Sequence, residues 1–313
     1  RRVLFRSRDS DDSGNWGSSQ MLRDIYSNYP QIISLSGHTH YINHDDAFIS
    51  TEGGFLSVGV PSLSDFEYND KVVDEITGGS IGSPIVNSRT YSFGQFYEVD
   101  KNGNIKLTRY DFKNDDVIKT PFVFPSVKSD GSHLEKLSLE YRESINTAPY
   151  IDPEKEKMLR INYTGEKSFD LIYPKFEDDD MVFYYHIVYK DNNGFILKNI
   201  KTMSPWHIYP NPNNIPETLT YNFKDVDYDN EYSIELSAVD QFMKESRILT
   251  ITMDINITVN KVLAGRIEDM ILDLMDVSDV DMSYYDKIKE ISGKDFKFYE
   301  GDVCDKALLN KIF

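Results

Sequence analysis

Three of the six histidines lie close together in the sequence, at His38, His40 and His44. Residues two positions apart in an extended turn point the same way, so the imidazoles of His38 and His40 can face one partner together. Neutral imidazole is a good ligand for Zn, Fe, Mn or Ni. The spacing therefore predicts that His38 and His40 bind metal, and Gly37 would let the backbone approach a metal or a phosphate closely.

His44 is a third candidate in the same cluster. It stands beside Asp45 and Asp46. One interpretation makes it a third ligand or a substrate contact, and the other makes it an exposed side chain. We expect His44 to be exposed, because polar neighbours of this kind usually face water.

The elements before the cluster have the order of an αβ unit. Apolar residues between Met21 and Tyr29 have helical spacing, and Pro30 ends the predicted helix. Ile32–Leu35 is predicted to be a short buried strand. Ser36–His40 is then the polar turn that leaves this strand.

Two β patterns follow along the chain. Apolar residues alternate at 91–99 and 105–109 around the turn Asp100–Asn104, whose Asn-Gly pair favours positive φ, so a hairpin is predicted. From Leu159 onward, several short strands with turn signals over about 100 residues indicate a β-sandwich. We expect Tyr232 to be buried in it, at a step like that before a tyrosine corner.

The turn Gly37–His40 resembles the last signature of calcineurin-like metallophosphoesterases, a Gly-His-X-His turn at a strand end. Asn15–Gly17, Tyr29–Gln31 and the hairpin Phe96–Phe112 strengthen the resemblance. They point to a bacterial branch of the family that carries a fibronectin III-like sandwich after its catalytic domain. The resemblance covers roughly Asp9–Ile257.

In that family two divalent metal ions, Mn, Fe or Zn, activate a bridging water against a phosphate ester. By resemblance, His38 would bind the second metal and His40 the first, while the catalytic residues are unknown. The earlier Asp-X-His, Gly-Asp, Gly-Asn-His and lone-His motifs of the family are not found among the 37 residues before His38. The chain is therefore expected to be the C-terminal part of a phosphoesterase and inactive as an isolated fragment.

The last residues carry a second resemblance. Tyr284–Phe313, above all Phe298–Val303, is similar to the early dinucleotide-binding region of UDP-glucose/UDP-galactose epimerases. By resemblance Asp302 and Val303 would lie near an adenine. The glycine-rich loop that holds the pyrophosphate is missing, so no cofactor-binding residue is assigned. The tail is either a natural α/β extension or a chimeric epimerase-like remnant, and we favour the remnant.

The predicted fold class is α+β and multi-domain: a partial α/β metallophosphoesterase sandwich, an Ig/fibronectin III-like β-sandwich and a short α/β tail. Arg1–Ser7 matches the translation of a common sequencing adapter, and we interpret it as a non-native leader. The predicted domains are the leader at 1–7, the C-terminal portion of the phosphoesterase domain at 8–125, a linker at 126–158, the fibronectin III-like sandwich at 159–258 and the tail at 259–313.

Composition limits the possible partners of the 313-residue chain. Its formal net charge of −18 argues against nucleic acid as a partner, because binding phosphates requires Lys and Arg. No apolar run reaches the roughly 20 residues of a membrane span, and the single cysteine, Cys304, excludes an internal disulfide. The expected substrate is a phosphate ester, and an extracellular or cell-surface bacterial location is favoured over a cytoplasmic one.

Rival functions remain open at this point. The sandwich could be a binding module that attaches the chain to a cell surface, a glycan or a protein, or the chain could carry a fragment of an NAD-dependent sugar-nucleotide epimerase. The acidic run Glu177–Asp180 could bind calcium, but three adjacent aspartates in a turn more often form a solvated loop, and EF-hand spacing is absent.

Overall fold

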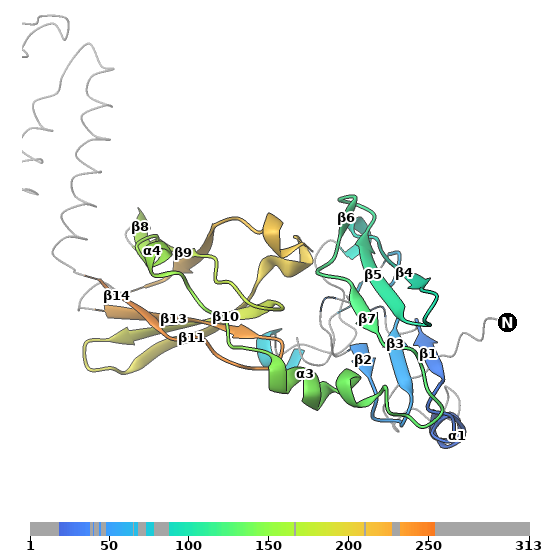
Figure 1. The fold of residues 1–313 in the computed structure, drawn as a ribbon. Helices are drawn as coiled ribbons and strands as arrows, with labels where there is room; N and C mark the ends of the chain where they lie inside the picture. The colour runs from blue at the N-terminus through green and yellow to red at the C-terminus, as the bar shows by residue number, and fades with distance from the viewer. Residues whose placement is uncertain are drawn as a thin grey trace, which may run out of the picture. The chain divides into compact units, whose positions relative to one another are not determined.

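A computed structural model describes residues 19–37, 40, 44, 48–64, 66–67, 73–77, 88–165, 167–209, 211–226 and 232–253 (Figure 1). The chain divides into two units, Arg1–Met253 and Asp254–Phe313, and all described residues belong to the first. The predictions made for the leader, for Asn15–Gly17 and for the tail lie outside the described residues.

The N-terminal part begins with one helix and a small three-stranded sheet. Its elements are α1 (Ser19–Tyr26), β1 (Ile33–Ser36), β2 (Ile49–Ser50) and β3 (Leu56–Gly59). The strand order is β1-β3-β2. β1 runs parallel to β3, with Ser36 opposite Gly59, and β2 runs antiparallel to β3. The predicted helix, strand and turn are therefore present in the expected order.

The prediction that Ile32–Leu35 forms a buried strand is wrong about the burial. No residue of β1 is buried, and Leu35 is 36% exposed. The side chains of a strand are buried by elements that pack on the faces of its sheet, and in β1 the N-terminal hydrophobic core takes in Ile33 but not Leu35. In α1, Tyr26 packs edge-on against Phe55 with ring centroids 5.3 Å apart, while Ile25 is exposed.

The predicted hairpin is confirmed and belongs to a second small sheet. The strands are β4 (Phe93–Val99), β5 (Ile105–Asp111), β6 (Asp116–Val117) and β7 (Phe122–Phe124). Gly103 has a φ of +83°, and the carboxylate of Asp100 accepts the backbone N–H groups of Asn102 and Asn104. The turn therefore forms as the sequence predicts, because glycine adopts the positive φ and the aspartate side chain accepts the backbone N–H groups.

The stretch predicted as a linker contains ordered helical turns. They are η4 (Glu135–Leu137), α3 (Leu139–Ile145) and α4 (Pro153–Glu156). Arg142 of α3 is buried and donates from Nη2 to the carbonyl oxygen of Ile49 at 2.6 Å, which fixes α3 to β2. Further turns are η2 (Val73–Thr77), η3 (Ser88–Thr90), η5 (Pro205–His207) and η6 (Pro212–Asn214). None of the described helices has the length and apolarity needed to cross a membrane.

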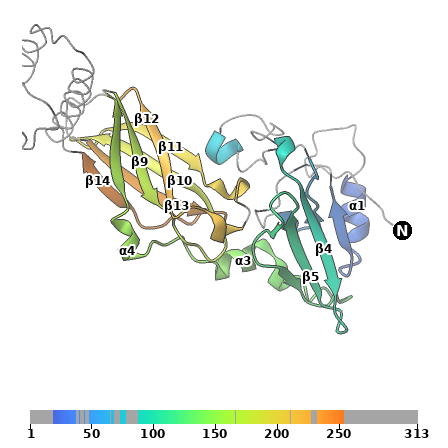
Figure 2. The ribbon, with the colours of Figure 1, turned by 90° about the horizontal axis from the view of Figure 1, so that it is seen from above.

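The predicted β-sandwich is confirmed (Figure 2). Its strands are β8 (Arg160–Gly165), β9 (Ser168–Pro174), β10 (Val182–Asp191), β11 (Ile196–Met203), β12 (Thr218–Lys224), β13 (Tyr232–Asp240) and β14 (Leu249–Met253). One sheet has the order β12-β9-β8 and the other β11-β10-β13-β14. All neighbouring strands in both sheets are antiparallel.

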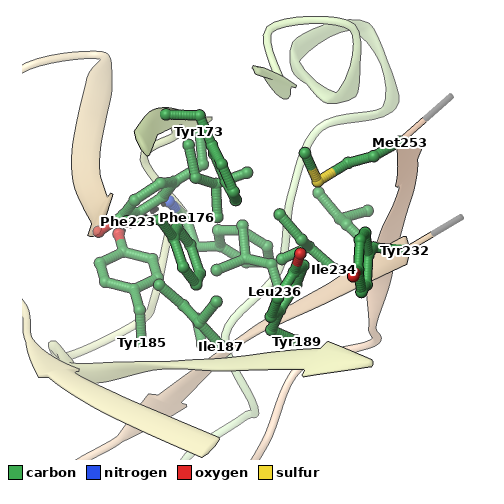
Figure 3. Packing of buried hydrophobic residues seen from close by; sticks show 14 of the residues in the cluster. Tyr173, Phe176, Tyr185, Ile187, Tyr189, Phe223, Tyr232, Ile234, Leu236 and Met253 are labelled. Carbon is green, nitrogen blue, oxygen red and sulfur yellow. Dashed lines mark hydrogen bonds between the residues drawn. The ribbon is translucent and has the colours of Figure 1, made fainter. Parts of the chain in front are cut away.

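The sandwich core is rich in aromatic rings (Figure 3). Phe169 stacks on Phe223 with centroids 4.6 Å apart, and Tyr189 stacks on Tyr232 at 5.0 Å. Tyr232 is 5% exposed, so its predicted burial is confirmed. Offset and edge-on ring pairs of this kind stabilise a core beyond the area they bury.

Candidate functional site

The candidate metal-binding turn leaves the carboxyl end of β1. The N–H of Val60 donates to the carbonyl oxygen of Ser36 at 2.6 Å, which holds the ends of the parallel strands β1 and β3 together. In open α/β sheets, ligands bind beyond the carboxyl ends of parallel strands. The Gly-His-Thr-His segment starts at the carboxyl end of the parallel pair β1–β3.

Of the two predicted ligands, His40 is described and His38 is not. His40 is half-buried, with a φ of 52° in the left-handed region, and its carbonyl oxygen accepts the N–H of Glu67 at 3.1 Å. Left-handed backbone is uncommon outside glycine and persists where the surroundings enforce it. The pairing of the two imidazoles on one metal stays a prediction.

Packing does not explain the glycine before the histidines. A Cβ added at Gly37 would meet Val60 at 3.8 Å, which is an ordinary contact distance. Gly37 also lacks a positive φ. The described neighbours therefore do not require glycine at this position.

The prediction that His44 is exposed is wrong. Its side chain is completely buried, and its ring lies 5.2 Å from both the Phe93 ring and the Trp206 ring. Trp206 belongs to η5, which follows β11 of the sandwich. Because the imidazole is enclosed between aromatic rings, His44 is placed as a packing residue of the loop after the candidate ligands.

An ion pair lies next to His44. The buried Lys119 donates from Nζ to the carbonyl oxygen of His44 at 3.0 Å and also pairs with Asp180. Asp180 precedes β10 of the sandwich. Sequence reasoning missed Lys119 and Trp206, because neither lies in a motif and their neighbours are distant in sequence.

The acidic run Glu177–Asp180 is held by contacts within the protein and is not a simply solvated turn. Each of its four carboxylates has a protein partner: Lys155 for Glu177, the backbone N–H groups of Asp180 and Met181 for Asp178, Asn146 and Thr147 for Asp179, and Lys119 for Asp180. The run therefore joins the sandwich to the segments that precede it.

A small hollow of about 40 Å³ lies beside this run. Its lining includes Lys119, Asp178, Asp180, Ser204 and Trp206. Burial raises the pKa of Asp178 to about 6, and the nearby carboxylate of Asp240 adds to the rise. The two lysines and three carboxylates that line the hollow leave it without a strong excess of either charge.

Two further histidines, His133 and His186, have structural partners. His133 is buried and accepts the N–H of Lys128 on Nδ1 at 3.2 Å. The ring nitrogens of His186 lie 3.4 Å from Glu245 and 2.7 Å from Asn199. Within the described part of the chain, no group of three or more His, Cys, Asp or Glu side chains is placed to hold a metal ion.

Comparisons with known proteins identify no family. No protein-family profile matches the chain. A UDP-glucose 4-epimerase from Haemophilus influenzae is 61% identical over 28 residues, which are 9% of this chain and 8% of the epimerase. The resemblance to epimerases is confirmed as a short sequence match of that length, and no more.

Three solved structures show low similarity. A structure described as a myokine has a TM-score of 0.24 and 14% sequence identity with this chain. The alignment covers 34% of this chain and 95% of the myokine chain. The FN1–FN3 domains of chicken CNTN1 have a TM-score of 0.24 with 10% identity, covering 52% of this chain and 40% of theirs. A β-1,2-glucanase from Parabacteroides distasonis has a TM-score of 0.23 with 15% identity, covering 48% and 17%. These TM-scores are too low to assign a fold, so the assignment of a β-sandwich is based on the strand order of the chain itself.

Proposed function

We propose that this chain carries the C-terminal part of a dinuclear-metal phosphoesterase, with His38 and His40 as metal ligands. The proposal is that two divalent ions, Mn, Fe or Zn, activate a bridging water that attacks a phosphate ester. His38 and His40 would supply one imidazole to each ion. The carboxylates that complete such a centre would come from motifs that the residues before His38 do not contain.

One observation carries the proposal: the histidine turn starts at the carboxyl end of a strand that pairs in parallel with its neighbour. β1 pairs with β3 from Ile33 to Ser36, and His40 follows in left-handed backbone. Parallel pairs are characteristic of α/β folds, although they also occur in mixed sheets such as this one.

Metal binding by the chain itself tests the ligands. We expect Co²⁺ titration, followed by absorption spectroscopy, to show a weak complex that His38→Ala or His40→Ala removes. His186→Ala is the matched control, because that imidazole pairs with Glu245 and Asn199 on the sandwich. Binding that is equal in all three variants would contradict the assignment of the ligands.

Turnover tests the completeness of the centre. Two neutral ligands leave each ion mostly solvated, so the pKa of the bound water would stay high and the phosphoryl clamp would be lost. We therefore expect no appreciable hydrolysis of p-nitrophenyl phosphate or bis-p-nitrophenyl phosphate with Mn²⁺, Zn²⁺ or Fe²⁺. Metal-dependent turnover that disappears in the His38→Ala/His40→Ala double variant would show that the missing motifs are dispensable.

A second candidate function is attachment through the sandwich, which we propose to be of the fibronectin III type. Lettered in chain order from β8 to β14, the strands are A, B, C, C′, E, F and G. Neighbouring strands then form one sheet in the order A-B-E (β8, β9, β12) and a second in the order C′-C-F-G (β11, β10, β13, β14). The specific observation is an exposed apolar segment at the start of the edge strand β11: Phe195, Ile196 and Leu197 are 70%, 49% and 45% exposed. Exposed apolar edge strands favour pairing with another chain.

The attachment proposal is tested with Phe195→Ser/Leu197→Ser. The double variant should lose retention on intact bacterial surfaces while keeping the wild-type unfolding transition. Val123→Ser, an exposed apolar residue of β7 in the other part of the chain, is the control. Equal retention of wild type and double variant would remove the observation that favours this function.

A further inference from the structure

The sandwich shares a hydrophobic core with the N-terminal part. In this core, Phe66, Tyr91, Phe93 and Ile118 of the N-terminal part pack with Met181, Phe183, Tyr184, Trp206 and Val239 of the sandwich. A register shift between Val182 and Tyr184 interrupts the pairing of β10 with β13. A bulge of this kind re-aims side chains, and here Phe183 and Tyr184 both join the shared core. One end of the sandwich is therefore built to pack against the N-terminal part.

His44 is held in this shared core. Its ring contacts Phe93 from β4 and Trp206 from η5, and Trp206 stacks on Phe183 at an interplanar angle of 12°. The indole N–H of Trp206 donates to the carbonyl oxygen of Phe183 at 3.0 Å. The indole is thus fixed by the sandwich, and it covers the imidazole of His44.

Lys119 links the backbone of His44 to the sandwich. Its ammonium donates to the carbonyl oxygen of His44 and pairs with Asp180, and the lysine side chain is almost completely buried. A buried cation needs a compensating charge, so loss of the carboxylate would leave an uncompensated ammonium in the core. The position of Lys119, and with it the hydrogen bond to His44, depends on Asp180.

The same core holds His40 from a second direction. The carbonyl oxygen of His40 accepts the N–H of Glu67, and the preceding Phe66 is completely buried against Phe93, with ring centroids 4.7 Å apart. His40 lies four residues before His44 in the sequence. The backbone of His40 is thus held to the shared core at two points. One is its own hydrogen bond from Glu67, and the other is the buried ring of His44 four residues later.

We propose that the end of the β-sandwich positions the candidate metal-binding turn, with Trp206 and the Lys119–Asp180 ion pair as positioning residues. The inference rests on the proposed phosphoesterase function for its purpose, but its physical content is the coupling of the sandwich to His40 and His44. The sandwich is then a structural support of the site in addition to any attachment that it performs.

Hydrogen–deuterium exchange of the full chain without metal tests the coupling. Trp206→Leu should accelerate exchange in peptides that cover Gly37–Phe48 by at least about tenfold, because the cover of His44 is lost. Phe223→Leu is the matched control: it truncates a buried ring of the main sandwich core, which does not include His44. Unchanged exchange at Gly37–Phe48 in Trp206→Leu, or an equal increase in both variants, overturns the inference.

A charge variant keeps the test valid if Trp206→Leu fails to fold. Asp180→Asn should accelerate exchange at His44 and its neighbours, whereas Asp179→Asn should not. Asp179 accepts hydrogen bonds from Asn146 and Thr147, so its loss removes a neighbouring charge but leaves Lys119 paired. The same exchange at His44 in both aspartate variants overturns the role of the ion pair.

Co²⁺ affinity then relates the coupling to the proposed function. Loss of groups that orient metal ligands costs about 10–100-fold in metal affinity, so Trp206→Leu and Asp180→Asn should weaken Co²⁺ binding by roughly tenfold while Phe223→Leu should not. If wild type binds no Co²⁺ but the exchange effects are present, the phosphoesterase proposal fails and the coupling stands. If wild type binds Co²⁺ through His38 and His40 and the exchange effects are absent, the coupling fails and the phosphoesterase proposal stands.

Discussion

The N-terminal part and the sandwich differ in how completely they enclose their strands. In the sandwich, two sheets cover one continuous aromatic core, and central residues such as Ile234 and Leu236 are completely buried. In the N-terminal part, two small sheets share a smaller core around Leu56 and Leu107, and β1 stays half-exposed. The difference indicates that the N-terminal part needs contacts outside its own sheets to bury its apolar residues. The shared core around His44 supplies some of these contacts.

The largest expected effect comes from truncating each region at a leucine. Leu236→Ala should lower the free energy of unfolding by about 2–5 kcal/mol, because it leaves a cavity in a fully enclosed core. Leu35→Ala on β1 should lower it by less than about 1 kcal/mol, because that side chain already contacts water. Urea denaturation of both variants measures the contrast. Equal losses would show that β1 is as enclosed as the sandwich.

A smaller effect is expected where α3 joins the N-terminal sheet. Arg142→Met keeps most of the buried stem but removes the hydrogen bonds to the carbonyl oxygens of Ile49 and Leu137. Unpaired buried carbonyls cost about 1–3 kcal/mol. The check is the unfolding midpoint in urea together with proteolysis of the segment around α3. Glu140→Gln, an exposed change on the same helix, should leave both measurements unchanged.

The two hairpins allow a closer comparison of the regions. Gly103 in the N-terminal part and Gly194 in the sandwich both have φ near +80°. Alanine in this conformation costs about 1–2 kcal/mol. A Cβ at Gly103 would also approach the Cβ of Ser126 at 3.2 Å, whereas at Gly194 it would meet nothing within 4 Å. Gly103→Ala should therefore be the more destabilising change in thermal unfolding. Equal destabilisation of the two variants would show that the crowding against Ser126 relaxes at no cost.

The smallest effect concerns pH at the junction of the regions. Burial raises the pKa of Asp178 from its ordinary value of 3.8 to about 6, so the folded chain holds this proton more tightly than the unfolded chain. The stability that this proton contributes is present below about pH 4 and is lost as the pH rises through about 6. Asp178→Asn should remove this dependence, which is about 1 kcal/mol after allowance for solvent screening.

The measurement is the difference in unfolding free energy between wild type and Asp178→Asn from pH 4 to pH 7. In the variant, the amide oxygen of the new side chain would still accept the backbone N–H groups of Asp180 and Met181, so the turn should persist. The variant should gain stability relative to wild type as the pH rises. A difference that stays constant over this range would show that Asp178 titrates normally.

Local patterns predicted the β elements well because their causes are local. The hairpin of β4 and β5 follows from alternation and an Asn-Gly turn, and the burial of Tyr232 follows from its place in an alternating strand. The exposure of His44 and the burial of β1 were predicted incorrectly. Both depend on which distant segments cover a residue, and no local pattern contains that information.

The candidate site divides in the same way. The amino-acid sequence alone determined that two imidazoles follow Gly37 at a spacing suited to metal, since spacing is a property of the chain. Only the tertiary structure decided that His44 lies between Phe93 and Trp206 and that Lys119 joins it to Asp180. Residues 44, 119, 180 and 206 are far apart in sequence, and they meet because burial of apolar surface and compensation of buried charge act through space.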